Sequence, residues 1–191
     1  AADHRHRGRR LRADRRHARP GGEIDAPAVV TGAGDTVGTD RTGGPALTIA
    51  SGTTAVVRGG AIDGGLALAS YQGASPTTRP IAVGGAGIDH GGLLQFGDGH
   101  VGGGAATALA APTASRSQAD GGPALVVESG RVTIDRGDFR SGGATTGGSR
   151  TNNVARSGDV HVVSAGSTLI LQGGTHIAAD ATADNSGISQ G

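Results

Sequence analysis

The chain has very few of the side chains that fill an ordinary globular core. Its 191 residues include no tryptophan, one tyrosine (Tyr71) and two phenylalanines (Phe96 and Phe139), against 38 glycines. Glycine adds little buried surface and loses the most conformational freedom on ordering, which argues against a compact two-layer domain. The chain must therefore stay disordered or build a thin, repetitive core.

Cysteine is also absent, which excludes disulfides and thiolate metal sites and is compatible with export in an unfolded state. No apolar run approaches the roughly 20 residues of a membrane helix, and no signal-peptide pattern is visible. Because the sequence begins at Ala1 without methionine, we interpret it as a piece of a longer protein.

Positive charge is concentrated at the start of the chain. Residues 1–20 hold eight arginines against Asp3 and Asp14, a net +6, whereas the other 171 residues hold nine arginines against fourteen acidic residues, a net −5. The basic stretch lacks the interleaved aromatics of a nucleic-acid site and the apolar face of a membrane-surface helix. We predict a disordered, solvated leader over residues 1–22 and no nucleic-acid partner.

Three segments of the remaining chain align with one another. Each reads as a strand, a tight Ser-Gly or Ala-Gly turn, a second strand and a glycine turn. They are GPALTIASGTTAVVRGGAI from Gly44, GPALVVESGRVTIDRGDF from Gly122 and GDVHVVSAGSTLILQGGTHI from Gly158. A degenerate copy between the first two includes GGLLQFGDGHVGG from Gly91, with Leu94 and Phe96 on one face.

The second strands alternate with a period of two, which predicts that equivalent aliphatic residues stack along a common interior. The pairs expected to face inward are Ala55 and Val57, Val132 and Ile134, and Leu169 and Leu171. We predict an all-β fold, a right-handed parallel β-helix over residues 23–191. Because the copies start 78 and then 36 residues apart, we expect an irregular period, with Gly-rich loops at about 66–80, 102–121 and 141–158.

The order of these features resembles that of pertactin-like autotransporter passengers. The shared features are ASGTT at Ala50 to Thr54, LQF at Leu94 to Phe96, and Arg136-Gly137-Asp138 at a strand end before a Gly-rich stretch. The resemblance implies a non-catalytic, monomeric adhesin on the outer surface of a Gram-negative cell or secreted from it. It also implies a C-terminal β-barrel translocator beyond Gly191.

Arg136-Gly137-Asp138 spells a tripeptide that integrins bind. It falls at or next to the slot of Gly59-Gly60 and Gly173-Gly174 in the other copies, so it should lie at a turn with its charged side chains in solvent. Arg136, Gly137 and Asp138 are the predicted receptor-binding residues, and a host cell-surface receptor is the predicted partner. The alternative is that Gly137 is simply the turn glycine of the repeat; Phe139 either fills a core position or contacts a receptor.

Other groups of acidic and histidine residues give weaker predictions of function. A β-helix polysaccharide lyase or hydrolase would use clustered carboxylates, but Asp63 aligns with Arg140 or Ile177 and no acidic ladder forms. The candidate carboxylates are Asp63, Asp135, Asp138, Asp180 and Asp184. The stretch from Gly84 to Gly92 begins like a calcium-binding nonapeptide, in a single copy. The body histidines share no metal-ligand spacing, and His161 replaces Leu47 as a partly buried strand residue. We predict no catalytic residue, cofactor or metal; an enzyme or a structural spacer is the alternative function.

Overall fold

The computed structural model describes residues 22–24, 29–36, 38–73, 77–111, 116–148, 152–184 and 188–190. These residues form 23 short β-strands and no helix. The leader predicted over residues 1–22 lies outside the described residues except for Gly22, which begins the first strand. Within the described part, the prediction of an all-β fold is confirmed.

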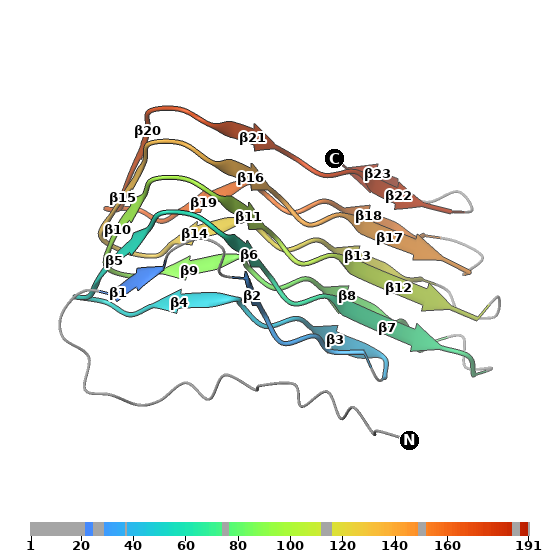
Figure 1. The fold of residues 1–191 in the computed structure, drawn as a ribbon. Coiled ribbons are helices and arrows are strands. Elements are labelled where there is room, and N and C mark those ends of the chain that lie inside the picture. The colour runs from blue at the N-terminus through green and yellow to red at the C-terminus, as the bar shows by residue number, and fades with distance from the viewer. Residues whose placement is uncertain are drawn as a thin grey trace, which may run out of the picture.

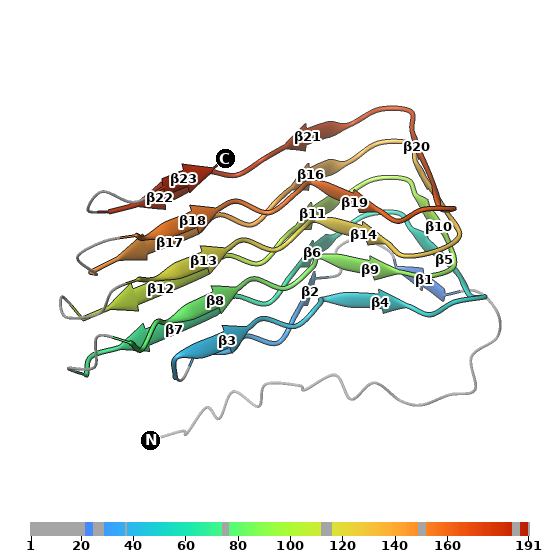
Figure 2. The same ribbon diagram turned by 180° about the vertical axis from the view of Figure 1, so that it is seen from behind.

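The strands stack as parallel pairs in five sheets, which we call A to E in the order that the chain visits them (Figures 1 and 2). Sheet A contains β1 (Gly22–Ile24), β5 (Thr54–Val57), β10 (Leu93–Phe96), β15 (Arg131–Ile134) and β20 (Thr168–Leu171). Sheet B contains β2 (Val29–Thr31), β6 (Ala61–Asp63), β11 (His100–Gly102), β16 (Asp138–Arg140) and β21 (Thr175–Ile177).

The other three sheets complete each coil. Sheet C contains β7 (Ala67–Tyr71), β12 (Ala106–Ala110), β17 (Ala144–Gly147) and β22 (Ala181–Ala183). Sheet D contains β3 (Asp40–Thr42), β8 (Ile81–Val83), β13 (Gln118–Asp120), β18 (Val154–Arg156) and β23 (Ile188–Gln190). Sheet E contains β4 (Leu47–Ile49), β9 (Ile88–His90), β14 (Leu125–Val127) and β19 (His161–Val163). The molecule is a parallel β-solenoid.

The coil length is nearly constant, which corrects the prediction of an irregular period. The strands β5, β10, β15 and β20 begin at residues 54, 93, 131 and 168, so successive coils are 39, 38 and 37 residues long. The 78-residue separation of the first two aligned copies is therefore two coils. The degenerate copy is the coil between them, since β10 pairs in register with both β5 and β15.

The three Gly-rich segments predicted as loops are also corrected. The range 66–80 contains β7, 102–121 contains β12 and β13, and 141–158 contains β17 and β18. The side chains with which these strands face the interior are mostly small, because sheets C and D enclose a core of alanine. Its buried members are Ala67, Ala69, Ala82, Ala106, Ala108, Ala119, Ala144 and Ala155. A narrow lobe of this kind resembles a loop in composition.

A second, wider core lies between sheets A, B and E. It contains Val57, Val132 and Ile134 of the predicted inward pairs together with both phenylalanines, and Ala55 and Leu169 pack against it partly buried. Leu171, the remaining predicted inward residue, is 48% exposed. Val57, Phe96 and Ile134 follow one another along one ladder of sheet A, and each is fully buried. Phe139 is 1% exposed, and its ring lies edge-on to that of Phe96 with 4.9 Å between centroids. Phe139 therefore fills a core position.

Glycines separate the two lobes at a waist where the opposite walls of the coil touch. One wall connects sheet B to sheet C, and the other connects sheet D to sheet E. Backbone N–H groups of one wall donate to carbonyls of the other at 2.8–2.9 Å, in a chain that runs from Gly158 through Gly142, Gly122, Gly104, Gly85, Gly65 and Gly44 to Ala33. A Cβ at Gly122 would collide with the carbonyl oxygen of Gly85, so the walls meet because side chains are absent.

Candidate receptor-binding corner

The predicted receptor-binding residues lie at the corner between sheets A and B. Four successive coils place a glycine with positive φ there: Gly60 (93°), Gly99 (118°), Gly137 (136°) and Gly174 (107°). The predicted alignment of the tripeptide with the glycine turns of the other copies is confirmed.

Gly137 is fixed by the fold on both sides. The N–H of Asp138 donates to the carbonyl of Gly99 at 2.8 Å, and the N–H of Thr175 donates to the carbonyl of Gly137 at 2.8 Å. A Cβ on Gly137 would lie 2.6 Å from Cε1 of Phe96. Glycine is therefore required at this corner whether or not a receptor binds there.

Arg136 and Asp138 are both exposed, one on either side of the buried Gly137. Neither side chain forms a hydrogen bond or an ion pair with another residue in the part of the chain that the structure describes. Arg136 belongs to the bend after β15, whereas Asp138 is the first residue of β16 and points out of sheet B. The corner therefore presents a guanidinium and a carboxylate from a backbone that is held by its neighbours.

Asp138 borders a hollow of about 270 Å³ on the outer face of sheet B. Its lining also includes His100 and Thr175, which are the register neighbours of Asp138 in the preceding and following coils, and Arg140. The hollow is thus bordered by the carboxylate of Asp138, the guanidinium of Arg140 and the imidazole of His100.

Asp63 reaches the same face from the coil before His100. Its Oδ1 lies 3.3 Å from Nε2 of His100, and Gly102 leaves the room for this contact because a Cβ there would collide with that oxygen. Asp63 shares a ladder with Gly102, Arg140 and Ile177, which confirms the predicted alignment and the absence of an acidic ladder. Asp63, His100 and Asp138 form a line across three coils that the sequence alignment did not reveal.

The other acidic candidates lie elsewhere. Asp135 lies in the bend after β15 and lines a hollow on sheet A, whereas Asp180 and Asp184 lie before and after β22. The stretch from Gly84 to Gly92 contains β9, with Asp89 paired in register between Thr48 and Val126. No group of three or more histidine and acidic side chains that could hold a metal ion occurs among the described residues.

Two histidines occupy the wide core near the end of the stack. His161 follows Leu47, Ile88 and Leu125 on one ladder, which confirms its predicted place in a strand. Its ring centroid lies 4.8 Å from that of His176, and His176 stacks on Phe139 with 5.4 Å between centroids. Burial lowers the pKa of His161 to about 4, and the charge of His176 acts in the same direction.

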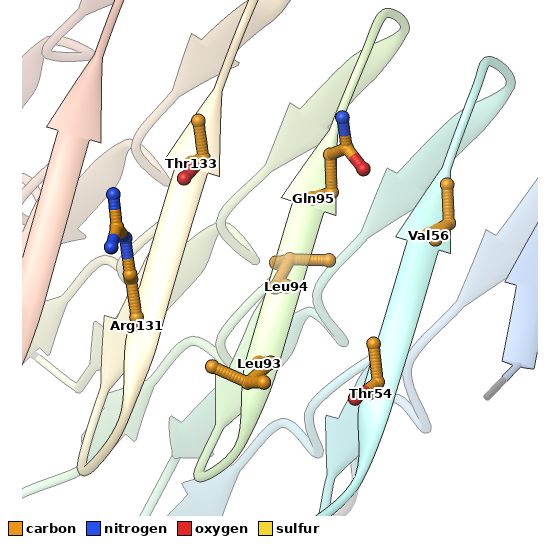
Figure 3. A pocket seen from close by; sticks show the side chains of 7 residues that line it. All are labelled: Thr54, Val56, Leu93, Leu94, Gln95, Arg131 and Thr133. Carbon is orange, nitrogen blue, oxygen red and sulfur yellow. The ribbon is translucent and has the colours of Figure 1, made fainter. Parts of the chain in front are cut away.

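A further hollowed surface, which sequence reasoning missed, lies on the outer face of sheet A (Figure 3). Its side chains come from β5, β10 and β15, and the exposed ones alternate with the core residues that the periodicity identified. The signal in the sequence that could have identified this surface is the change of residue type from coil to coil at the outward positions of the second strands. Leu93, for example, stands between Thr54 and Arg131.

Comparison with protein-family models, with curated proteins and with solved structures found no match to this chain. The described residues also include no helix long and apolar enough to cross a membrane. The parallel β-solenoid, of about four turns, is consistent with an autotransporter passenger fold and equally with a β-helix enzyme.

Proposed function

We propose that this chain is a non-catalytic adhesive segment of a surface-displayed, pertactin-like autotransporter passenger. The observation that carries the proposal is the corner at Gly137, where Arg136 and Asp138 expose opposite charges on either side of a buried glycine. The solenoid supplies a stiff rod that holds this corner away from the cell. A host receptor of the integrin class is the proposed partner.

Two features of the corner suit such a contact. The carboxylate of Asp138 has no partner among the described residues, so it is available to complete the coordination of a divalent cation on a receptor. The backbone on either side of Gly137 is bonded to the preceding and following coils, which reduces the ordering cost of binding.

The test is to replace Asp138 by Glu and to measure the attachment of integrin-bearing cells to the immobilised chain. We expect attachment to fall at least about tenfold, because the longer side chain moves the carboxylate away from the cation while the ladder of sheet B is kept. Asp159→Glu is the matched control, since Asp159 is exposed between sheets D and E. Circular dichroism should give the same β content for all three proteins; equal attachment by all three would contradict the proposal.

The line of Asp63, His100 and Asp138 supports a second candidate, a β-helix polysaccharide lyase or hydrolase. Asp63 would orient His100 as a base and Asp138 would act as the acid across the hollow on sheet B. Release of unsaturated or reducing-end products from acidic glycans, abolished by His100→Gln, would establish this function in place of the adhesive one. A structural spacer would show neither attachment nor product.

A further inference from the structure

The outer face of sheet A differs from its inner face in how it varies along the stack. Inward positions stay aliphatic or aromatic from coil to coil, as in Val57, Phe96 and Ile134. Outward positions change chemistry at every coil. One outward ladder reads Thr54, Leu93, Arg131 and Thr168, and the next reads Val56, Gln95, Thr133 and Ile170. The outer face therefore presents a different set of side chains at each coil, which a ligand that spans several coils could distinguish.

A third outward ladder follows the last residue of each strand and contains an unexpected glycine. The N–H groups of Gly97, Asp135 and Gln172 donate to the carbonyls of Val57, Phe96 and Ile134 at 2.7–2.8 Å, so Arg58, Gly97, Asp135 and Gln172 occupy equivalent positions. Gly97 thus stands between an arginine and an aspartate.

Neither packing nor backbone conformation requires glycine at position 97. The nearest atom to a Cβ built there is the carbonyl oxygen of Val57 at 3.5 Å, an ordinary van der Waals distance. Gly97 is also not among the glycines with positive φ. Its effect is to leave open a hollow of about 270 Å³, which Arg58, Gln95 and Asp135 line.

A second hollow of about 270 Å³ adjoins the first and shares Val56 and Gln95 with it. Figure 3 shows its lining: Thr54 and Val56 on β5, Leu93 and Gln95 on β10, and Arg131 and Thr133 on β15. Leu93 is 51% exposed. Arg131 is exposed too, and its guanidinium has no hydrogen bond or ion pair with any described residue.

The geometry points to a binding strip for an acidic oligosaccharide on the outer face of sheet A, with one sugar ring over Leu93 and Gln95 and the next over Gly97. Each hollow is smaller than the sites that enclose drug-sized ligands, and suits a single ring. Thr54, Gln95 and Thr133 offer hydroxyl and amide partners for sugar hydroxyls, and Leu93 offers an apolar surface for the C–H face. This strip is separate from the corner residues Arg136 and Asp138.

Charge selects an acidic sugar over a neutral one. Arg131 is the one charged residue that lines the hollow over Leu93 and Gln95, whereas Arg58 and Asp135 both border the hollow over Gly97. Planar guanidinium groups bind carboxylate and sulfate groups through paired charge-assisted hydrogen bonds. The backbone groups of β10 bond to the coils on both sides, so recognition uses side chains and does not require an added peptide strand.

The experiment is isothermal titration of the 191-residue chain with a tetramer of galacturonate and with the neutral galactose tetramer of the same linkage. We expect the acidic tetramer to bind at least about tenfold more tightly, since hydrogen bonds to charged groups are the stronger ones. Gly97→Gln, which fills one hollow, and Arg131→Gln should each reduce affinity about tenfold or more. Arg79→Gln, at an exposed site before β8, removes the same charge and should change nothing.

The variants separate a site from general attraction. No binding of the acidic tetramer at millimolar concentration, or equal binding of the neutral one, would overturn the inference. It would also be overturned if Arg79→Gln weakened binding as much as Arg131→Gln, or if Gly97→Gln bound like the parent chain. Because the Cβ at position 97 meets no close contact, Gly97→Gln should keep the parent melting temperature, and its loss of binding would not reflect unfolding.

Discussion

Individual glycines have different roles in this chain, and the structure tells them apart. Gly122 and its counterparts allow two backbones to touch at the waist, and Gly137 allows a corner with positive φ beside Phe96. Gly97 has neither role. The presence of a glycine in the sequence therefore does not show that the fold requires it. Substitution by alanine distinguishes the glycines that the fold requires from those that it does not.

Gly122→Ala should destabilise the fold, because its Cβ would collide with the carbonyl oxygen of Gly85 and lie 2.7 Å from the carbonyl carbon of Gly84. We expect a loss of about 2–4 kcal/mol in the free energy of unfolding, the cost of forcing packed backbones apart. Gly97→Ala is the matched control and should be neutral or stabilising by up to about 1 kcal/mol, since alanine restricts the unfolded chain. Urea unfolding of both proteins measures the two changes in the free energy of unfolding. Equal changes would mean that the two walls at the waist can move apart at little cost, and would contradict the prediction.

At the scale of the strand, the sequence predicts the wide lobe well and the narrow lobe poorly. Sheets A and E have large aliphatic residues at alternate positions, so the turn glycines and inward pairs could be identified from the repeat. Sheets C and D bury alanines, which carry no periodic signal against a background of glycine and threonine, so the sequence predicts loops where these strands form. Their pairing depends on contacts across the coil that no local pattern encodes.

The candidate site divides in the same way. The position of Arg136-Gly137-Asp138 at a corner follows from aligning the copies, and the structure confirms it. The approach of Asp63 to His100 depends on register between neighbouring coils and on the missing side chain of Gly102. That register could be derived only after the intermediate coil, with its weaker pattern, had been placed.

The free energy of unfolding should depend on pH through His161, whose ring lies in the wide core. His161 belongs to β19, and its neighbour His176 belongs to β21. In the unfolded chain a histidine binds its proton near pH 6.5, whereas burial lowers the pKa of His161 in the folded chain to about 4. Between these values the unfolded chain holds more protons, so the free energy of unfolding falls as the pH is lowered through this window.

We expect about 1 kcal/mol of stability to be lost through His161 between pH 7.5 and pH 5, after allowance for the partial solvent access of the ring. His161→Leu restores the aliphatic character of Leu47, Ile88 and Leu125 on its ladder and should remove that share of the loss. Urea unfolding of both proteins at the two pH values measures the difference. If both lost equal stability, His161 would not be the group responsible.

The whole molecule is a one-dimensional stack, so the stability of a coil depends on its neighbours. The strands β20 and β21 lie at one edge of their sheets, at the end of the stack (Figure 1). Inward residues there are uncovered: Val163 is 44% exposed where its ladder neighbour Val127 is fully buried, and Leu171 is 48% exposed where Ile134 is fully buried. The last coil therefore gains less from burial than the coils before it.

Hydrogen exchange of the 191-residue chain should reveal this gradient. Amides of β10, β14 and β15, which have a paired strand on each side, should exchange slowest, and those of β19 and β20 at least about tenfold faster. The comparison is best made within one ladder, between Val127 and Val163, because the two residues share side-chain type and sheet position. Leu171→Arg should leave the protection of β10 unchanged, since nearest-neighbour coupling decays along a stack. Uniform exchange across all coils would instead show that the solenoid opens as a single cooperative unit, with the glycine waist transmitting stability from end to end.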